Sequence, residues 1–319
     1  MRQRIQVKTP EQLARMREAG LVVARTLAVL RDAVRPGIST QELDEIAAAT
    51  IRSEGAVPSF LGYLGYPATI CASVNEVIVH GIPRPDRVLR DGDIISIDCG
   101  AILDGWHGDA AITVGVGEID PADQALLDAC RAALRAGIER AMAGGRLGDI
   151  SHAVERSVAG SGDYGLIREY TGHGIGTEMH MDPAVPNYGP PGRGPRLRAG
   201  MALAIEPMIT RGSRHSTELD DGWTVVTADG SRAAHFEHTI AITPDGPWVL
   251  TAENQDHYQD LDTEQTIPSP QRQAAAVPRG STMPPGDTPD PGGPHPPVHA
   301  RSRSEDIGHA PVGHRSDAR

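Results

Sequence analysis

Four carboxylates lie in or beside apolar runs of the kind that form buried strands. Asp98 and Glu206 end two such runs, Asp109 precedes a third, and Glu237 lies inside a fourth. Side chains alternate along a strand, so each acid taken alone is also compatible with a solvated face. Four of them in one domain favour a shared site, because carboxylates gathered in a partly buried place are strongly disfavoured unless cations compensate them. The pattern predicts a site for divalent cations, two of which would balance four carboxylates.

A histidine framed by glycines is the candidate nitrogen ligand. His173 lies in the segment GHGIG at 172–176, and His180 follows it closely. Glycines allow the backbone to approach closely and to aim a side chain into a cleft. A lone histidine is more often a hydrogen-bonded polar residue than a ligand, so the glycine frame is the argument for ligation. Aspartate, glutamate and histidine without cysteine suit manganese, iron, cobalt or zinc. These residues alone predict a dinuclear metallohydrolase of undetermined substrate.

Capping signals and β-branched runs indicate the elements that must position these residues. The segment TPEQ at 9–12 combines an N-cap, a proline at the first helical position and a capping-box partner, and Ser39 with Glu42 repeats the box. We expect helices from 10 to the Pro-Gly pair at 36–37, from 40 onward, from 121 toward 144, and over 150–159. We expect strands over 70–80, 93–99, 110–116, 201–205 and 234–243. This mixture is typical of an α+β domain.

Composition bounds the class of protein. Of 319 residues, 39% are hydrophobic and 23% charged, as in soluble globular proteins, and the net charge of −12 argues against a nucleic-acid partner. Cys71, Cys99 and Cys130 form no close-spaced pair, which favours a reducing compartment. We see no secretory signal and no run approaching the roughly 18 apolar residues of a membrane helix. We expect a cytoplasmic protein without a membrane partner.

The last part of the chain differs from the rest. Every Trp, Tyr and Phe lies at or before Tyr258, and proline and glycine dominate afterwards. Such a segment buries too little apolar surface to offset its ordering entropy. We therefore expect a folded domain over 1–258 and a disordered Pro/Gly-rich tail over 259–319. A proline-rich ligand for a partner domain is the alternative for this tail.

Five motifs occur in order along the folded part. They are CASVNEVIVHGIP at 71–83, IDCG at 97–100 with GD at 108–109, GHGIG at 172–176, IEP at 205–207, and DGWT at 221–224 with FEHT at 236–239. This set resembles the methionine aminopeptidases of the bacterial type I class. The resemblance implies a pita-bread (creatinase/aminopeptidase-like) fold, with pseudo-two-fold symmetric halves around a dinuclear metal site. It implies a monomer that hydrolytically removes the N-terminal methionine from nascent proteins, preferably before a small second residue.

The same resemblance implies a role for each candidate ligand. Asp98 would chelate one metal ion, His173 and Glu206 would bind the other, and Asp109 and Glu237 would bridge the pair, with Co, Mn, Fe or Zn undetermined. A metal-bridged hydroxide would be the nucleophile, and Glu206 would accept the proton of its parent water.

Further residues would act on the substrate. His180 would hydrogen-bond the developing oxyanion, and His80 would contact the scissile amide or help deliver a proton. Both are thus expected to be catalytic and substrate-binding. The resemblance places the methionine pocket at Phe60, Tyr63, Tyr66, Cys71 and Trp223, with Met179 where many members carry phenylalanine. The remaining histidines match no role and are expected to be structural or exposed: His107, His152, His215, His235 and His238.

Two alternatives remain beside this hypothesis. A proline-specific dipeptidase or aminopeptidase of the same fold usually carries a large extra N-terminal domain, whereas only 79 residues precede His80. A non-catalytic pita-bread binding protein would be expected to have lost metal ligands, and this chain keeps all five. The expected partners are N-termini of nascent polypeptides, with the ribosome as a place to meet them.

Overall fold

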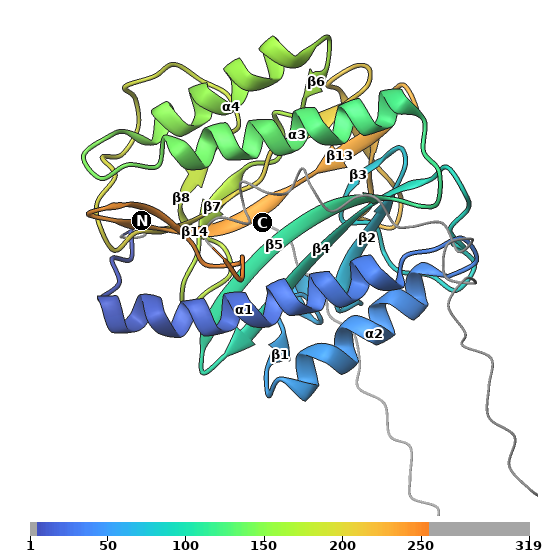
Figure 1. Cartoon of the computed structure of the whole chain (residues 1–319), viewed down its shortest axis with the longest axis horizontal. Coiled ribbons are helices and arrows are strands. Elements are labelled where there is room, and N and C mark those ends of the chain that lie inside the picture. The colour runs from blue at the N-terminus through green and yellow to red at the C-terminus, as the bar shows by residue number, and fades with distance from the viewer. Residues whose placement is uncertain (1–4, 255–319) are drawn as a thin grey trace, which may run out of the picture. The chain divides into compact units, whose positions relative to one another are not determined.

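An antiparallel sheet forms the centre of the chain (Figure 1). The computed structural model describes residues 5–254, so the expected boundary at 258 and the tail at 259–319 lie outside the described residues. Neighbouring strands follow the order β1 (Val57–Pro58), β4 (Ile94–Leu103), β5 (Trp106–Gly115), β14 (Glu237–Thr243), β9 (Ala202–Ile205), β7 (Gly172–Gly174) and β8 (Met181–Val185). In addition, β2 (Ile70–Val74) pairs with β4, and β15 (Gly246–Val249) pairs with β14.

Two small antiparallel sheets lie beside the large one. The first contains β13 (Ala233–His235), β10 (Met208–Thr210) and β6 (Gly165–Leu166). The second contains β11 (Ser216–Glu218), β12 (Val225–Thr227) and β3 (Val77–Val79). Two expected strands are therefore each divided in two. The run 70–80 breaks at Asn75, which has a φ of 57°, and the run 234–243 breaks at Phe236.

Four helices within the described residues cover the sheet, and the first three begin where the sequence signals place them. Thr9 and Ser39 form the expected capping boxes of α1 (Pro10–Ala33) and α2 (Thr40–Ser53). Asp120 caps α3 (Pro121–Glu139), which ends before the expected region near 144. The fourth helix, α4 (Leu147–Ser161), begins earlier than expected, because the Asp149 carboxylate accepts a hydrogen bond from Arg146 N at its start. A short 3-10 turn, η1 (Tyr63–Gly65), completes the helical set of the described residues.

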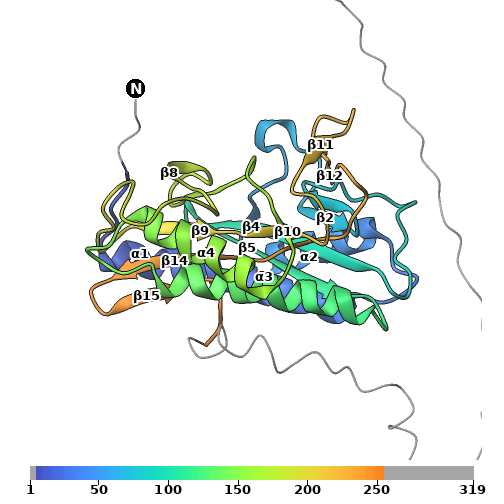
Figure 2. The ribbon, with the colours of Figure 1, turned by 90° about the horizontal axis from the view of Figure 1, so that it is seen from above.

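The helices lie on one side of the large sheet, and the small sheet with β11 and β12 lies on the other (Figure 2). The order of two helices followed by strands occurs twice along the chain. The pair α1 and α2 lies along one edge of the view in Figure 1, and the pair α3 and α4 lies along the opposite edge. This arrangement confirms the α+β expectation. None of the helices within 5–254 combines the length and apolar character that a membrane span requires.

Each helix pair buries its apolar stripe against its own part of the sheet. Leu27 and Leu43 belong to the same buried cluster as Ile95 and Ile97 of β4. In the other half, residues of α3 and α4 cluster with those of β9 and β14. Because side chains alternate along β4, the burial of Ile95 and Ile97 under the helices turns Asp98 to the opposite, helix-free face. The hydrophobic pattern thus decides which face carries the acids.

We predict opposite effects for alanine at two helical glycines. In Gly20→Ala, the new Cβ would lie 2.2 Å from the carbonyl oxygen of Leu250. We expect the free energy of unfolding to fall by about 1–3 kcal/mol through overpacking. At Gly160 in α4, no atom lies within 4 Å of such a Cβ, so Gly160→Ala should stabilise by about 0.5–1 kcal/mol. Urea unfolding followed by circular dichroism measures both; a stabilised Gly20→Ala would contradict this helix packing.

Candidate functional site

Strand register brings three of the predicted acids together. Asp98 on β4 and Glu237 on β14 each pair with Ala111 of β5, one from either side. Asp109 lies two residues before Ala111 on β5, so its side chain projects from the same face. The three carboxylates therefore converge across adjacent strands. Asp109 lies inside β5, whereas the sequence analysis placed it before the strand.

Glu206 and His173 approach from the neighbouring strands. Glu206 directly follows β9, and His173 is the middle residue of β7. The glycines around His173 are required by close backbone packing. A Cβ on Gly172 would lie 2.3 Å from Ala204 O, and one on Gly174 would lie 2.3 Å from Asp182 O. The expected role of the glycine frame is thus visible in the packing of β7 between its neighbours.

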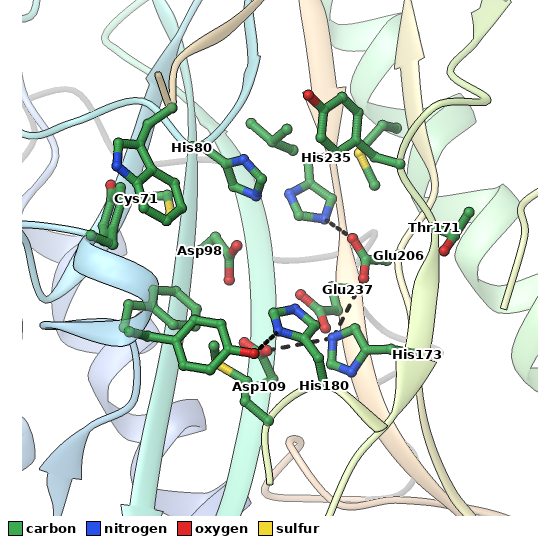
Figure 3. A pocket seen from close by; sticks show the side chains of 18 of the residues that line it. Cys71, His80, Asp98, Asp109, Thr171, His173, His180, Glu206, His235 and Glu237 are labelled. Carbon is green, nitrogen blue, oxygen red and sulfur yellow. Dashed lines mark hydrogen bonds and ion pairs between the residues drawn. The ribbon is translucent and has the colours of Figure 1, made fainter. Parts of the chain in front are cut away.

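The imidazole of His173 faces the acids with one nitrogen (Figure 3). Its Nε2 lies 3.8 Å from Asp109 Oδ2 and 3.7 Å from Glu206 Oε1. Its Nδ1 lies 3.0 Å from Gly174 O. Because a carbonyl oxygen only accepts, Nδ1 carries the proton and Nε2 presents a lone pair to the carboxylates. Asp109, His173 and Glu237 each offer one ligand atom, and these three atoms lie within 4.8 Å of one another.

Burial makes this cluster electrostatically costly without compensation. Burial raises the pKa of Asp98 to about 7. Burial and the neighbouring charges of Asp98 and Glu206 raise the pKa of Asp109 well above its ordinary value. Burial, followed by neighbouring carboxylate charge, likewise raises the pKa values of Glu206 and Glu237. Burial lowers the pKa of His173 to about 3, so this imidazole is neutral and able to donate its lone pair.

The donor set fits a divalent cation. Asp98 Oδ1, Asp109 Oδ1 and Glu237 Oε1 are buried and have no hydrogen-bond partner. Buried polar atoms are almost always satisfied, so three such oxygens in one cavity indicate a missing charge partner. A cation about 2.0–2.2 Å from each ligand atom holds neighbouring ligands about 3–4 Å apart, close to the separations around His173. The residues therefore fit a metal site in both chemistry and spacing.

An apolar pocket adjoins the acids within one cavity of about 240 Å³. All eight residues expected to bind substrate line this cavity: Phe60, Tyr63, Tyr66, Cys71, His80, Met179, His180 and Trp223. Tyr66 and Trp223 meet edge to face, with ring centroids 5.0 Å apart. The His180 Nδ1 lies 2.9 Å from the Tyr63 hydroxyl, which ties this histidine to the pocket wall.

Several cavity residues were missed by the sequence analysis. Tyr170, Thr171, Met208 and His235 also line it. His235, which we expected to be structural or exposed, is 2% exposed and lies beside Glu206. The signal that could have found it is its spacing of two from Glu237, which is compatible with a shared face along extended chain.

The other four unassigned histidines do not line the cavity. The Nδ1 of His107 lies 3.1 Å from Ser59 Oγ, and the buried His238 ring pairs with the Thr251 hydroxyl. His152 is half-buried on α4, and His215 is exposed. These placements agree with the expected structural or surface roles.

A curved antiparallel sheet with paired helices on one face, and buried carboxylates with an imidazole on the other, defines a metallopeptidase of the pita-bread fold. The chain belongs to metallopeptidase family M24, which it matches over residues 14–244. It is 57% identical over 245 residues to Methionine aminopeptidase 1 of Mycobacterium tuberculosis (strain CDC 1551 / Oshkosh), covering 75% of this chain and 92% of that protein.

Solved structures agree with this assignment. A crystal structure of methionine aminopeptidase from Thermotoga maritima superposes with a TM-score of 0.77 and 44% identity, over 78% of this chain and 100% of that one. An Xaa-Pro dipeptidase from Bacillus anthracis superposes with a TM-score of 0.62 and 22% identity, over 78% of this chain and 62% of that one. At that identity the likeness shows the fold alone.

We predict that the metal-free protein loses stability as the pH rises from about 6.5 to about 8. Below this window buried histidines with lowered pKa values, such as His173 and His235, offset the carboxyls. Within it the raised carboxyl pKa values mean that the folded state binds more protons than the unfolded chain, and stability falls wherever that holds. The stability that a protonated Asp98 contributes is lost as the pH rises through its folded pKa of about 7. For Asp98 the loss should be on the order of 2–4 kcal/mol, measured by urea unfolding of chelator-treated protein.

Asp98→Asn is the matched variant for this measurement, because asparagine keeps the size of the side chain and cannot ionise. The variant should lose less stability over the same pH window than the wild type. Saturating Mn(II) should restore wild-type stability most strongly at the alkaline end. Equal pH dependence in the wild type and Asp98→Asn would show that the Asp98 pKa is not raised by folding.

Proposed function

We propose that this protein is a methionine aminopeptidase, which hydrolytically removes the N-terminal methionine from nascent proteins, preferably when the second residue is small. The proposal rests on one cavity that contains both the candidate metal ligands and an apolar pocket. Five predicted metal ligands line it together with the apolar pocket around Cys71 and Trp223. Membership of family M24 and the likeness to proteins named methionine aminopeptidase support the same activity.

We infer that the cavity holds two divalent metal ions, drawn from Co, Mn, Fe or Zn. Asp98 would chelate one ion, His173 and Glu206 would hold the other, and Asp109 and Glu237 would bridge them. The partnerless buried oxygens and the neutral His173 support this assignment. When bound, the ions would neutralise the carboxylates and supply the Lewis acidity that makes water a nucleophile near neutral pH.

Glu206 would accept the proton of the attacking water. Among the four candidate carboxylates, it is the one whose two oxygens each face an imidazole at 3.7 Å, His173 on one side and His235 on the other. Burial raises the pKa of Glu206 well above its ordinary value, as suits a group that must take a proton and release it again. The same proton could then pass to the leaving amine.

His180 and His80 would act on the peptide itself. Burial lowers the pKa of both imidazoles, to about 4 for His80, so each is neutral and carries one N–H. If the Tyr63 hydroxyl donates to His180 Nδ1, the remaining N–H is on Nε2 and is free for a developing oxyanion. His80 has a left-handed φ of 60°, a costly conformation that fits a side chain aimed at the scissile amide.

The pocket would select methionine through shape and polarisability. Phe60, Tyr66, Cys71 and Met179 form one buried cluster, against which Trp223 packs. Aromatic rings and sulfur suit a flexible thioether. The cavity of about 240 Å³ is smaller than sites for drug-sized ligands, and it suits one side chain at a chain end.

A proline-specific dipeptidase of the same fold is the less supported alternative, since the Xaa-Pro dipeptidase shares only the fold at 22% identity. A non-catalytic binding protein is opposed by the five candidate ligands that line one cavity. We further propose a cytoplasmic monomer that meets nascent chains at the ribosome. The three buried free cysteines support a reducing compartment, and sedimentation velocity would test the monomer.

We predict metal-dependent release of methionine from the peptide Met-Ala-Ser. The protein would be stripped of metal and reconstituted with Co(II), Mn(II) or Fe(II), with a proline-containing dipeptide assayed in parallel. Asp109→Ala and Glu206→Ala should each lower kcat/KM by about 10³-fold or more, because several kcal/mol of transition-state stabilisation are lost with the metal site. Cleavage of the proline dipeptide alone would move the protein to the proline-specific branch.

Two further variants sharpen this assay. His180→Ala should lower kcat by about 10²–10³-fold while leaving metal affinity unchanged, because His180 lies outside the proposed ligand set. Asp163→Ala removes an exposed carboxylate away from the cavity and should behave as the wild type. No hydrolysis by folded wild-type protein with any of the metals would contradict the enzymatic function.

A further inference from the structure

His235 is a buried imidazole that the proposed mechanism does not use. It ends β13, lines the cavity, and is 2% exposed. Its Nε2 is buried and has no hydrogen-bond partner, although it lies only 3.7 Å from Glu206 Oε2 (Figure 3). A buried ring nitrogen without a partner is uncommon and calls for a ligand, an ion or a movement that satisfies it.

The two oxygens of Glu206 face different imidazoles. Oε1 lies 3.7 Å from His173 Nε2, on the side where the candidate ligand atoms of Asp109 and Glu237 gather. Oε2 lies 3.7 Å from His235 Nε2. Oε1 of Glu206 therefore faces the candidate metal ligands, and Oε2 faces His235.

The backbone of His235 is held firmly by a buried hydroxyl pair. Its N–H donates to Thr113 Oγ1 at 2.9 Å, and the Thr113 hydroxyl donates to its carbonyl oxygen at 2.7 Å. Because the Thr113 hydroxyl has one proton and donates it to the His235 carbonyl oxygen, the Ser96 hydroxyl is the donor in the 2.8 Å contact between Ser96 and Thr113. Thr113 and Ser96 are 0% and 2% exposed. These hydrogen bonds fix the backbone position from which the His235 side chain extends.

We propose that His235 is a positioning residue for Glu206: its neutral imidazole donates Nε2–H to Oε2 and keeps Oε1 turned toward the metal and the attacking water. An ionised carboxylate only accepts, so this tautomer gives the buried Nε2 an acceptor, whereas a lone pair on Nε2 would face the carboxylate unpaired. The 3.7 Å gap is about 0.5–1 Å longer than a hydrogen bond. Catalytic hydrogen bonds commonly tighten when a site is loaded.

This inference rests on the proposed metal-binding role of Glu206, and its first test is metal binding without substrate. The affinity of chelator-treated protein for Co(II) would be measured by calorimetry, and the visible Co(II) absorption recorded. His235→Leu removes the donor and should weaken Co(II) binding by about 10–100-fold, as loss of a hydrogen bond to a metal-binding carboxylate does. His235→Gln keeps an N–H donor and should stay within about threefold of the wild type.

The methionine-release assay adds a second readout. His235→Leu should lower kcat more than it raises KM, since Glu206 acts on water and not on the methionine side chain, and His235→Gln should recover most of the rate. His152→Leu, a half-buried histidine on α4 outside the cavity, controls for the loss of a surface cobalt ligand. If His235→Leu does not fold, His235→Met replaces it as the variant without a donor.

The outcomes separate this inference from the proposed function. Wild-type Co(II) affinity in a folded His235→Leu or His235→Met would overturn the positioning role. A His235→Gln as weak as His235→Leu, with altered Co(II) absorption bands, would also overturn it, because His235 would then be a direct ligand. Tight Co(II) binding that depends on His235, in a wild type that releases no methionine, would support the positioning role and reject the enzyme assignment.

Discussion

Buried carboxylates repel one another, and the arrangement of strands, glycines and imidazoles around them follows from that repulsion. Asp98, Asp109 and Glu237 converge from three adjacent strands, and each keeps one buried oxygen without a partner. Because these atoms are buried, folding gathers negative charge where it is most expensive. Such a cluster persists only when cations offset it or when its members hold protons, and family M24 consists of metallopeptidases.

The fold is arranged to make that convergence unavoidable. The helices bury one face of the sheet, and side-chain alternation then directs the acids to the other face. The glycines beside His173 let β7 pack close enough for its imidazole to reach Asp109 and Glu206. The apolar pocket around Trp223 opens on the same face, so the side chain that is recognised and the bond that is cut can lie together.

Local sequence was sufficient for the features that depend on local physics. The capping boxes at Thr9 and Ser39 located two helix starts to the residue. The alternation of isoleucines around Asp98 indicated which face it occupies. Motif resemblance supplied the pocket residues, all of which line the cavity.

Features that depend on pairing between distant strands could not be obtained in this way. The opposition of Asp98 and Glu237 across Ala111 is a matter of register, which no single segment encodes. The break at Asn75 follows from a left-handed turn inside a run that is otherwise typical of one strand. His235 was missed because its neighbour Glu206 follows a strand, β9, that only the tertiary structure brings beside it.

A crystal structure of the protein grown with Mn(II), with anomalous scattering recorded from the metal, would show whether cations occupy this cluster. We expect two anomalous peaks in the cavity, both within bonding distance of Asp109 and Glu237, one of them reached by Asp98 and the other by His173 and Glu206. Ordered side chains at these positions with no peak between them, or peaks only elsewhere on the molecule, would contradict this expectation.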